Sequence, residues 1–157
     1  MKRLIVADAS PLIALHDGDC IDVLALAFDE VIIPERVFNE VYRRRPRVKP
    51  SWVKVRRVEG APALARIEVL RTERGLDLGE SEAIALAEGL ELYVLLDEWN
   101  ARAICRELGV AHISAYHVCH KLHRDGLLKA KRLAEVERAL RLHGGFTPDP
   151  RDESGIA

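Results

Sequence analysis

Short apolar runs alternate with longer amphipathic segments along the chain. The apolar runs are of strand length and lie at 4–7, 31–33, 52–58, 93–96 and 111–115. The segments with helical spacing are 11–28 (two short helices), 35–44, 62–74, 80–90, 99–108, 116–125 and 129–143. The first helix is expected to begin with Ser10 as its cap and Pro11 in its first turn. Strands that alternate with helices predict βαβ units, and hence a parallel sheet with helices on both faces.

Two of the predicted strands end directly in a carboxylate. Asp8 follows the run at 4–7, and Asp97 follows the run at 93–96. In an open parallel sheet, ligands bind beyond the carboxyl ends of the strands, where the strand order reverses. If these two strands are neighbours, Asp8 and Asp97 face the same crevice. Two negative charges held close together repel each other unless a cation lies between them.

Two further acids are expected near this edge of the sheet. Glu40 and Glu80 each lie at the border of the buried face of a predicted helix. Glu82 is about 200° around the helix from Glu80, so the two do not easily share one site. Four carboxylates on separate elements suit Mg²⁺ or Mn²⁺, which prefer oxygen ligands, better than Zn²⁺. Such an ion can ionise a water molecule and stabilise charge on a phosphate.

Each of these acids also has a purely structural interpretation. Asp8 and Asp97 each precede a predicted helix and could serve only as its cap. Glu40 could be a solvated residue late in an amphipathic helix. Glu80 could only complement the dipole of the helix that it opens.

The charged residues are balanced overall but unevenly distributed. There are 24 Lys and Arg residues against 25 Asp and Glu, for a net charge of −1. The segment from Arg43 to Arg57 nevertheless holds eight Lys or Arg residues and no acid. This stripe, which begins with Arg43, Arg44 and Arg45, either contacts RNA phosphates or is a solvated surface. Aromatic residues make up only 5% of the chain, which argues against a stacking platform for RNA bases.

Arg102 and a group of histidines leave alternatives open. Arg102 follows Asp97 by five residues, and it either grips a phosphate or pairs at the surface with Glu98 or Glu107. The histidines at 117, 120 and 123 are expected mainly on the outer face of their helix, which argues against a zinc site.

The cysteines and the N-terminal segment indicate the compartment. The chain has three widely spaced cysteines and no pair with the spacing of a zinc ligand set or a disulfide framework. The apolar run that follows Met1 is too short for a signal peptide or a membrane span. We therefore expect a cytoplasmic protein without membrane contact.

Four segments in order resemble the PIN domain superfamily, and are most similar to an uncharacterised PIN-like branch related to VapC toxin ribonucleases. They are Ile5–Leu15, Val31–Val41 with Glu40, Leu78–Ala87, and Leu95–Arg102 with Asp97, and the resemblance covers roughly residues 4–128. It implies a three-layer α/β/α sandwich whose five-stranded parallel sheet has the strand order 3-2-1-4-5.

The resemblance also implies a metal-dependent ribonuclease site that holds Mg²⁺ or Mn²⁺. The acids carried over by position are Asp8, Glu40, Glu80 and Asp97. Ser10 would support Asp8 or a metal-bound water, Glu82 is the alternative third acid, and Glu98 could share the role of Asp97. RNA, a second copy of the chain and a cognate antitoxin are the implied partners, as in VapBC-like toxin–antitoxin systems.

A second function stays open alongside the nuclease. Typical PIN nucleases have Asp as the third acid and Thr two residues before the fourth, where this chain has Glu80 and Leu95. The alternative is a catalytically weak PIN-like module that binds RNA or a protein partner without cleavage. In either case we expect a single domain over residues 1–146, followed by a flexible C-terminal tail at 147–157.

Overall fold

The computed structural model of the chain describes residues 1–144. Its centre is a parallel sheet with the strand order β3-β2-β1-β4-β5. The strands are β1 (Leu4–Ala7), β2 (Glu30–Pro34), β3 (Val53–Arg56), β4 (Val94–Leu95) and β5 (His112–Ile113). The predicted parallel sheet and its strand order are both confirmed. The order reverses between β1 and β4, the two strands that end in Asp8 and Asp97.

The sheet is buried on both faces, which explains why its strands are apolar at successive positions. Ile5 and Ala7 of β1 pack into one hydrophobic core, whereas Val6 between them packs into the other. In the same way, Leu95 faces the first core and Val94 the second. Successive side chains of a strand point to opposite faces, so the central strands β1, β2 and β4 each supply both cores.

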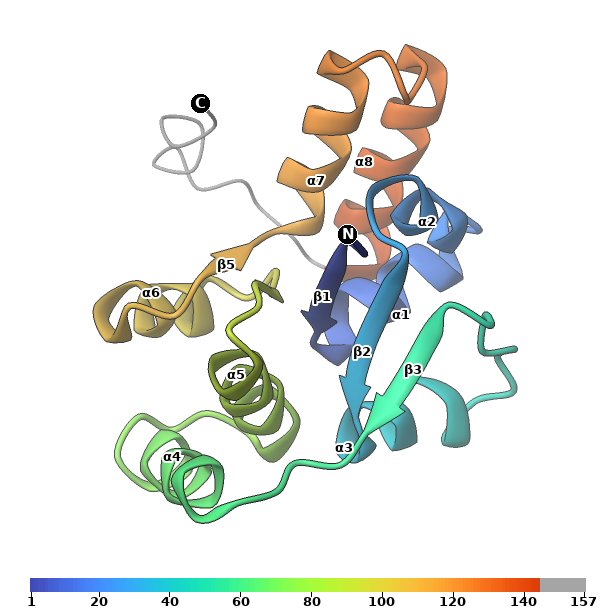
Figure 1. Cartoon of the computed structure of the whole chain (residues 1–157). Coiled ribbons are helices and arrows are strands. Elements are labelled where there is room, and N and C mark those ends of the chain that lie inside the picture. The colour runs from blue at the N-terminus through green and yellow to red at the C-terminus, as the bar shows by residue number, and fades with distance from the viewer. Residues whose placement is uncertain (145–157) are drawn as a thin grey trace.

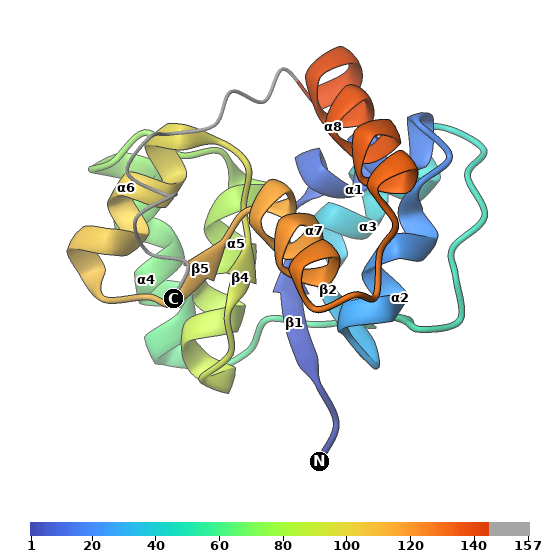
Figure 2. The same ribbon diagram turned by 90° about the horizontal axis from the view of Figure 1, so that it is seen from above.

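Helices cover both faces and complete the three-layer α/β/α arrangement (Figures 1 and 2). The core on one face includes side chains of α1, α2, α3, α7 and α8, and the core on the other face includes those of α4, α5 and α6. Their bounds are α1 (Ala9–Asp17), α2 (Leu24–Ala27), α3 (Glu35–Phe38), α4 (Ala61–Thr72), α5 (Leu78–Leu90), α6 (Trp99–Leu108), α7 (Ala115–Arg124) and α8 (Ala130–Gly144). A short 3₁₀ turn, η1 (Ile21–Val23), precedes α2.

The predicted helix 35–44 is not continuous. After α3 the chain widens into a π-helical segment, η2 (Asn39–Arg43), which contains Glu40. Single π-helical turns are uncommon and occur frequently at functional sites. The spacing of apolar residues did not distinguish this π-helical segment from a continuous α-helix. Val37 and Val41 are buried here, and their spacing of four residues would place them on one face of an α-helix as well.

Two helix starts differ from their predicted positions. The helix α1 begins at Ala9 with Asp8 in the N-cap position, so Ser10 lies in the first turn and is not the cap. The helix α5 begins at Leu78, inside the predicted loop 75–79. Its start is stabilised by a capping box, in which Asp77 Oδ1 accepts from Glu80 N at 2.8 Å and Glu80 Oε2 accepts from Asp77 N at 3.2 Å.

Two sequence-based expectations concern the chain ends and the membrane. The predicted domain end at residue 146 and the predicted tail at 147–157 lie outside the described residues. Within residues 1–144, no helix combines the length and the apolar character that crossing a membrane requires.

Candidate active site

Asp8 occupies the junction between β1 and α1, beside β4. Its backbone N–H donates to the carbonyl oxygen of Leu95 at 3.1 Å, and the residue is only 3% exposed. Its side chain makes no capping hydrogen bond to α1 within the part of the chain that the structure describes. The interpretation of Asp8 as nothing more than a helix cap is therefore not supported.

Asp97 lies on the same edge of the sheet, two residues after Leu95, which pairs with Ala7 of β1. It is 8% exposed, and its Oδ1 accepts from the backbone N–H of Ala115 at 2.8 Å. Its Oδ2 is buried and has no hydrogen-bond partner among residues 1–144. The cap of α6 is Glu98, whose side chain accepts from Ala101 N at 3.3 Å. Asp97 is thus not a cap of the following helix, and one of its oxygens is left for another ligand.

Several acids surround Asp8. Burial raises the pKa of Asp8 from 3.8 to about 7, against a lowering by the amide of Ala9. The negative charges of Asp77, Glu40 and Asp97 raise it further. Residues from three other parts of the chain therefore lie close enough to repel the Asp8 carboxylate, as the acidic edge predicted from the sequence requires.

The carboxyl group of Asp97 also has a raised pKa. Burial raises its pKa to about 6, while the amide of Ala115 and the charge of Arg102 act in the opposite direction. Arg102 is itself only 3% exposed. Arg102 therefore does not lie at the open surface, where the sequence left room for an ion pair with Glu98 or Glu107.

Glu80 joins this group from the first turn of α5. Its pKa is raised to about 8, first by burial and then by the charges of Asp77 and Asp8. Glu98 also raises it, so the cap of α6 lies near the same site. The capping box ties Glu80 to Asp77, and the helix start thereby delivers both carboxylates to the edge of the sheet.

Glu40 approaches the site across the start of α5, and Gly79 leaves room for it. A Cβ atom at position 79 would lie 2.9 Å from Glu40 Oε1, closer than side chains tolerate. The same oxygen accepts from Arg36 Nε at 3.3 Å, one helical turn earlier in the chain. Gly79 thus leaves space for the Glu40 carboxylate against α5, and a side chain at position 79 would require that flexible carboxylate to shift.

Glu82 lies on a different side of α5 from Glu80. Burial raises its pKa, against the backbone amide and the charge of Arg36, and the charges of Glu35 and Glu40 raise it further. Its Oε2 is buried without a hydrogen-bond partner in the described part of the chain. Glu82 thus faces α3 while Glu80 neighbours Asp8, as the angle of about 200° between them predicted.

Sequence reasoning missed Asp77 and Gly79. Asp77 stands three residues before Glu80, and this spacing of two acids is the sequence signature of a capping box. That signature would have placed the helix start correctly and Asp77 at the site with it. Gly79 had no comparable signal, because its role depends on a residue 39 positions away in the chain.

The predicted supporting residue and the predicted RNA-binding arginines of the basic stripe lie on the surface. Ser10 is exposed on the first turn of α1. Arg43, Arg44 and Arg45 are exposed at the end of η2, and Arg45 lies 3.9 Å from a carboxylate oxygen of Asp17. The histidines of α7 were expected mainly on the solvent-facing side of the helix, and this expectation is wrong for His117.

That histidine, His117, is 7% exposed and belongs to the start of α7. Its Nδ1 lies 2.9 Å from Ser114 Oγ, which also accepts from the backbone N–H of His117. The buried pair therefore helps to form the N-terminal cap of this helix.

The acids that the structure gathers fit a hard divalent cation in their chemistry. They supply carboxylate oxygens, and Asp97 offers a buried oxygen without a partner among residues 1–144. In these same residues, no three His, Cys, Asp or Glu side chains are already arranged to hold one ion together. Mg²⁺ keeps several of its waters and commonly uses one or two carboxylates, so it does not require a complete protein cage.

Fold and site together define an α/β protein with a crowded acidic edge at the point where the strand order of a parallel sheet reverses. A family model for the PIN domain matches residues 4–148, and the chain belongs to this family. PIN domains are generally nucleases and typically use divalent metal ions. A comparison with curated proteins finds no match. The relation to VapC toxins stays a prediction.

Proposed function

We propose that this protein is a metal-dependent endoribonuclease that hydrolyses phosphodiester bonds of RNA with Mg²⁺ or Mn²⁺. The observation that supports it most directly is the placement of Asp8, a carboxylate whose pKa is raised first by burial and then by the nearby charges of Asp77, Glu40 and Asp97. Negative charges packed at this density are stabilised when a cation lies among them. Asp8 and Asp97 are both buried, and a cation would offset the cost of burying two carboxylates at one edge of the sheet.

In this proposal Asp8, Glu40, Glu80 and Asp97 hold the metal. When bound, the ion lowers the pKa of its water and stabilises charge on the phosphate. Asp8 is held rigidly because it directly follows the buried strand β1. Asp97 lies two residues after β4 and accepts the first amide of α7. Asp77 orients Glu80 through the capping box.

Other residues play supporting parts in the proposal. Ser10 supports Asp8, and Glu82 and Glu98 contribute charge at the border of the site. Arg102 holds the RNA backbone beside Asp97, and Arg43, Arg44 and Arg45 contact it at the rim. We extend the proposal to a cytoplasmic homodimer controlled by an antitoxin protein, as in VapBC-like systems.

Cleavage of labelled single-stranded RNA in the presence of Mn²⁺ tests the nuclease. Asp8→Asn is expected to abolish cleavage while the circular dichroism spectrum is unchanged. Glu59→Gln is the matched control, because it neutralises an exposed carboxylate outside the site and should cleave at the wild-type rate. Wild-type cleavage by Asp8→Asn would refute the proposed site.

A second candidate is a module that binds RNA or a protein partner without cleaving RNA. It is favoured by the finding that no three ligands are already gathered for one ion among residues 1–144. Calorimetry with Mn²⁺ separates the two functions. Heat of binding that disappears in Asp8→Asn supports the nuclease, whereas no metal uptake together with intact RNA binding supports the second candidate.

A further inference from the structure

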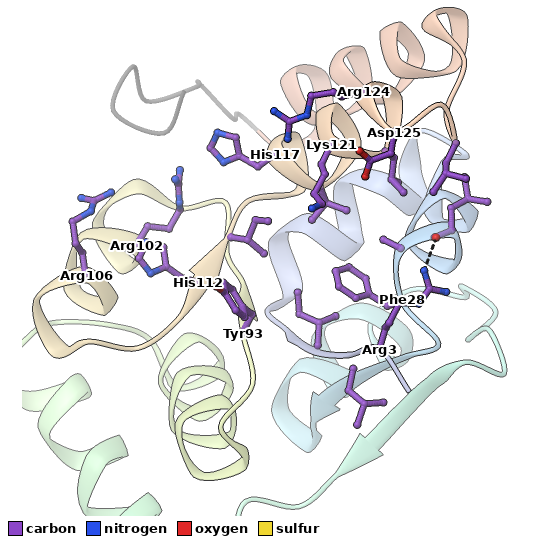
Figure 3. Close-up of a pocket in the computed structure, with 18 residues that line it drawn as sticks. Arg3, Phe28, Tyr93, Arg102, Arg106, His112, His117, Lys121, Arg124 and Asp125 are labelled. Carbon is purple, nitrogen blue, oxygen red and sulfur yellow. Dashed lines mark hydrogen bonds between the residues drawn. The ribbon is translucent and has the colours of Figure 1, made fainter. Parts of the chain in front are cut away.

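A cavity of about 700 Å³ has a lining that includes none of the acids around Asp8. Figure 3 shows the side chains that line it. It opens between α6 and α7 and reaches the end of α2. The sheet residues that line it, among them Arg3, Tyr93 and His112, lie at or just before the amino ends of β1, β4 and β5. Its size is within the usual range for ligand sites, about 300–1,000 Å³.

The lining of this cavity is strongly cationic. Asp125 is the single acid among the described residues that line it. Five Lys and Arg side chains come from three directions, namely Arg3, Arg102, Arg106, Lys121 and Arg124. Figure 3 shows Arg102 and Arg106 on α6 and Lys121 and Arg124 on α7, on the two sides of the opening. An excess of positive charge in a concave site concentrates anionic ligands there.

Apolar and aromatic side chains lie between these cations. Phe28, Ile113 and Leu122 are part of the lining, and Tyr93 stands at its edge with 56% of its surface exposed. An exposed ring beside several cations is the combination that binds single-stranded nucleic acid, since bases stack on the ring while cations contact phosphates.

One end of the cavity adjoins the acidic site. Arg102 lines the cavity, and its charge acts on Asp97. The helix α7 begins at Ala115, whose amide binds Asp97, and its lining residues continue to Arg124 and Asp125. At 1.5 Å per residue, the cavity wall therefore extends about 14 Å from the acidic site.

The stripe at 43–57 offers less free positive charge than its sequence indicated. Arg47 pairs with Asp17 at 2.9 Å, and Arg45 lies 3.9 Å from the same residue. Lys49 donates to the carbonyl oxygen of Val53 at 2.6 Å. Part of the stripe thus stabilises the fold. In the cavity, Arg3 likewise pairs with Asp29 at 3.2 Å, and Arg106, Lys121 and Arg124 line the same open space.

We infer that the cavity between α6 and α7 is a binding groove for single-stranded RNA, with phosphates on Arg106, Lys121 and Arg124 and a base on Tyr93. That the bound strand is the one cut at Asp8 and Asp97 rests on the proposed nuclease function. Binding in the groove itself does not.

Fluorescence anisotropy of a short labelled oligouridylate, with EDTA present to prevent cleavage, tests the groove. The double variant Lys121→Glu/Arg124→Glu should bind at least tenfold more weakly. Its plot of log affinity against log salt should be shallower by about 1.4, since each lost phosphate contact on a single strand removes about 0.7. The matched control is Lys131→Glu/Arg138→Glu, two exposed positions on α8 outside the lining. Equal affinity for all three proteins, or equal loss in both variants, would overturn the inference.

Tyr93 provides an independent test of the stacking part. Tyr93→Ala should weaken binding roughly 5- to 150-fold, whereas Tyr93→Phe, which keeps the ring, should bind like wild type. Loss in both variants, or in neither, contradicts stacking. Polyglutamate serves as a competitor that carries charge without bases. If it displaces the RNA as well as unlabelled RNA does, the groove is a site for an acidic peptide and the inference fails.

These measurements separate the groove from the nuclease. Weakened binding by the α7 double variant in a chain that cleaves nothing would support the groove and refute the nuclease. An active chain whose α7 double variant retains the wild-type KM and affinity would refute the groove and leave the nuclease standing. Asp8→Asn should bind the oligouridylate with unchanged affinity within a factor of about three.

Discussion

Neutralising Asp8 should stabilise the metal-free protein at alkaline pH. The pKa of Asp8 is 3.8 without its folded surroundings and about 7 within them. Between these values the folded chain holds a proton that the unfolded chain has released, so the free energy of unfolding falls as the pH rises. At about 1.4 kcal/mol for each pKa unit, the cost above pH 7 is about 4 kcal/mol.

Asp8→Asn removes this cost, because an amide of nearly the same size stays neutral at every pH. At pH 8 the variant should therefore be more stable than wild type by up to about 4 kcal/mol. For a chain of this length, that corresponds to a rise in Tm of roughly 8–16 °C. At pH 4 wild-type Asp8 is protonated when folded, and the two proteins should melt within about 2 °C of each other.

Differential scanning calorimetry of both proteins in EDTA, at pH 4 and pH 8, checks this result. Glu59→Gln controls for the change in net charge, since that carboxylate is exposed. Adding Mn²⁺ at pH 8 should raise the Tm of wild type but not of Asp8→Asn, because an ion bound to the folded state alone stabilises it. A variant that melts at or below the wild-type temperature at pH 8 would show that burial and the surrounding acids do not raise the pKa of Asp8.

Two further substitutions test how the other acids are placed. Gly79→Ala should lower Mn²⁺ affinity and the cleavage rate at least tenfold by displacing Glu40. The control Gly89→Ala, whose new Cβ meets no other atom within 4 Å among the described residues, should leave both unchanged and raise stability by about 0.5–1 kcal/mol. Calorimetry and an RNA cleavage assay measure these effects, and equal behaviour of the two variants would contradict the role of Gly79. Glu80→Gln should reduce the cleavage rate at least tenfold and Glu82→Gln less than threefold, because only the first lies beside Asp8; the reverse order in single-turnover rates would exchange their roles.

Much of the fold follows from local patterns that the tertiary structure left intact. The apolar run at 4–7 and the helix at 99–108 have the predicted bounds, and Gly109 ends that helix with a positive φ of 72°. The start of α5 was misplaced because capping by Asp77 depends on a single residue and not on periodicity. Such a residue shifts a boundary without changing the apolar pattern.

By itself, the sequence determined that Asp8 and Asp97 stand at the carboxyl ends of strands. A continuous apolar run of this length is typical of a strand buried in a parallel sheet, and a charged Asp side chain marks the end of such a run. Only the tertiary structure decided which other acids approach them. Asp77 and Glu80 reach Asp8, whereas Glu82 turns toward α3. The physical reason is that periodicity along the chain sets which face of an element is buried, while the distance between two side chains depends on how separate elements pack.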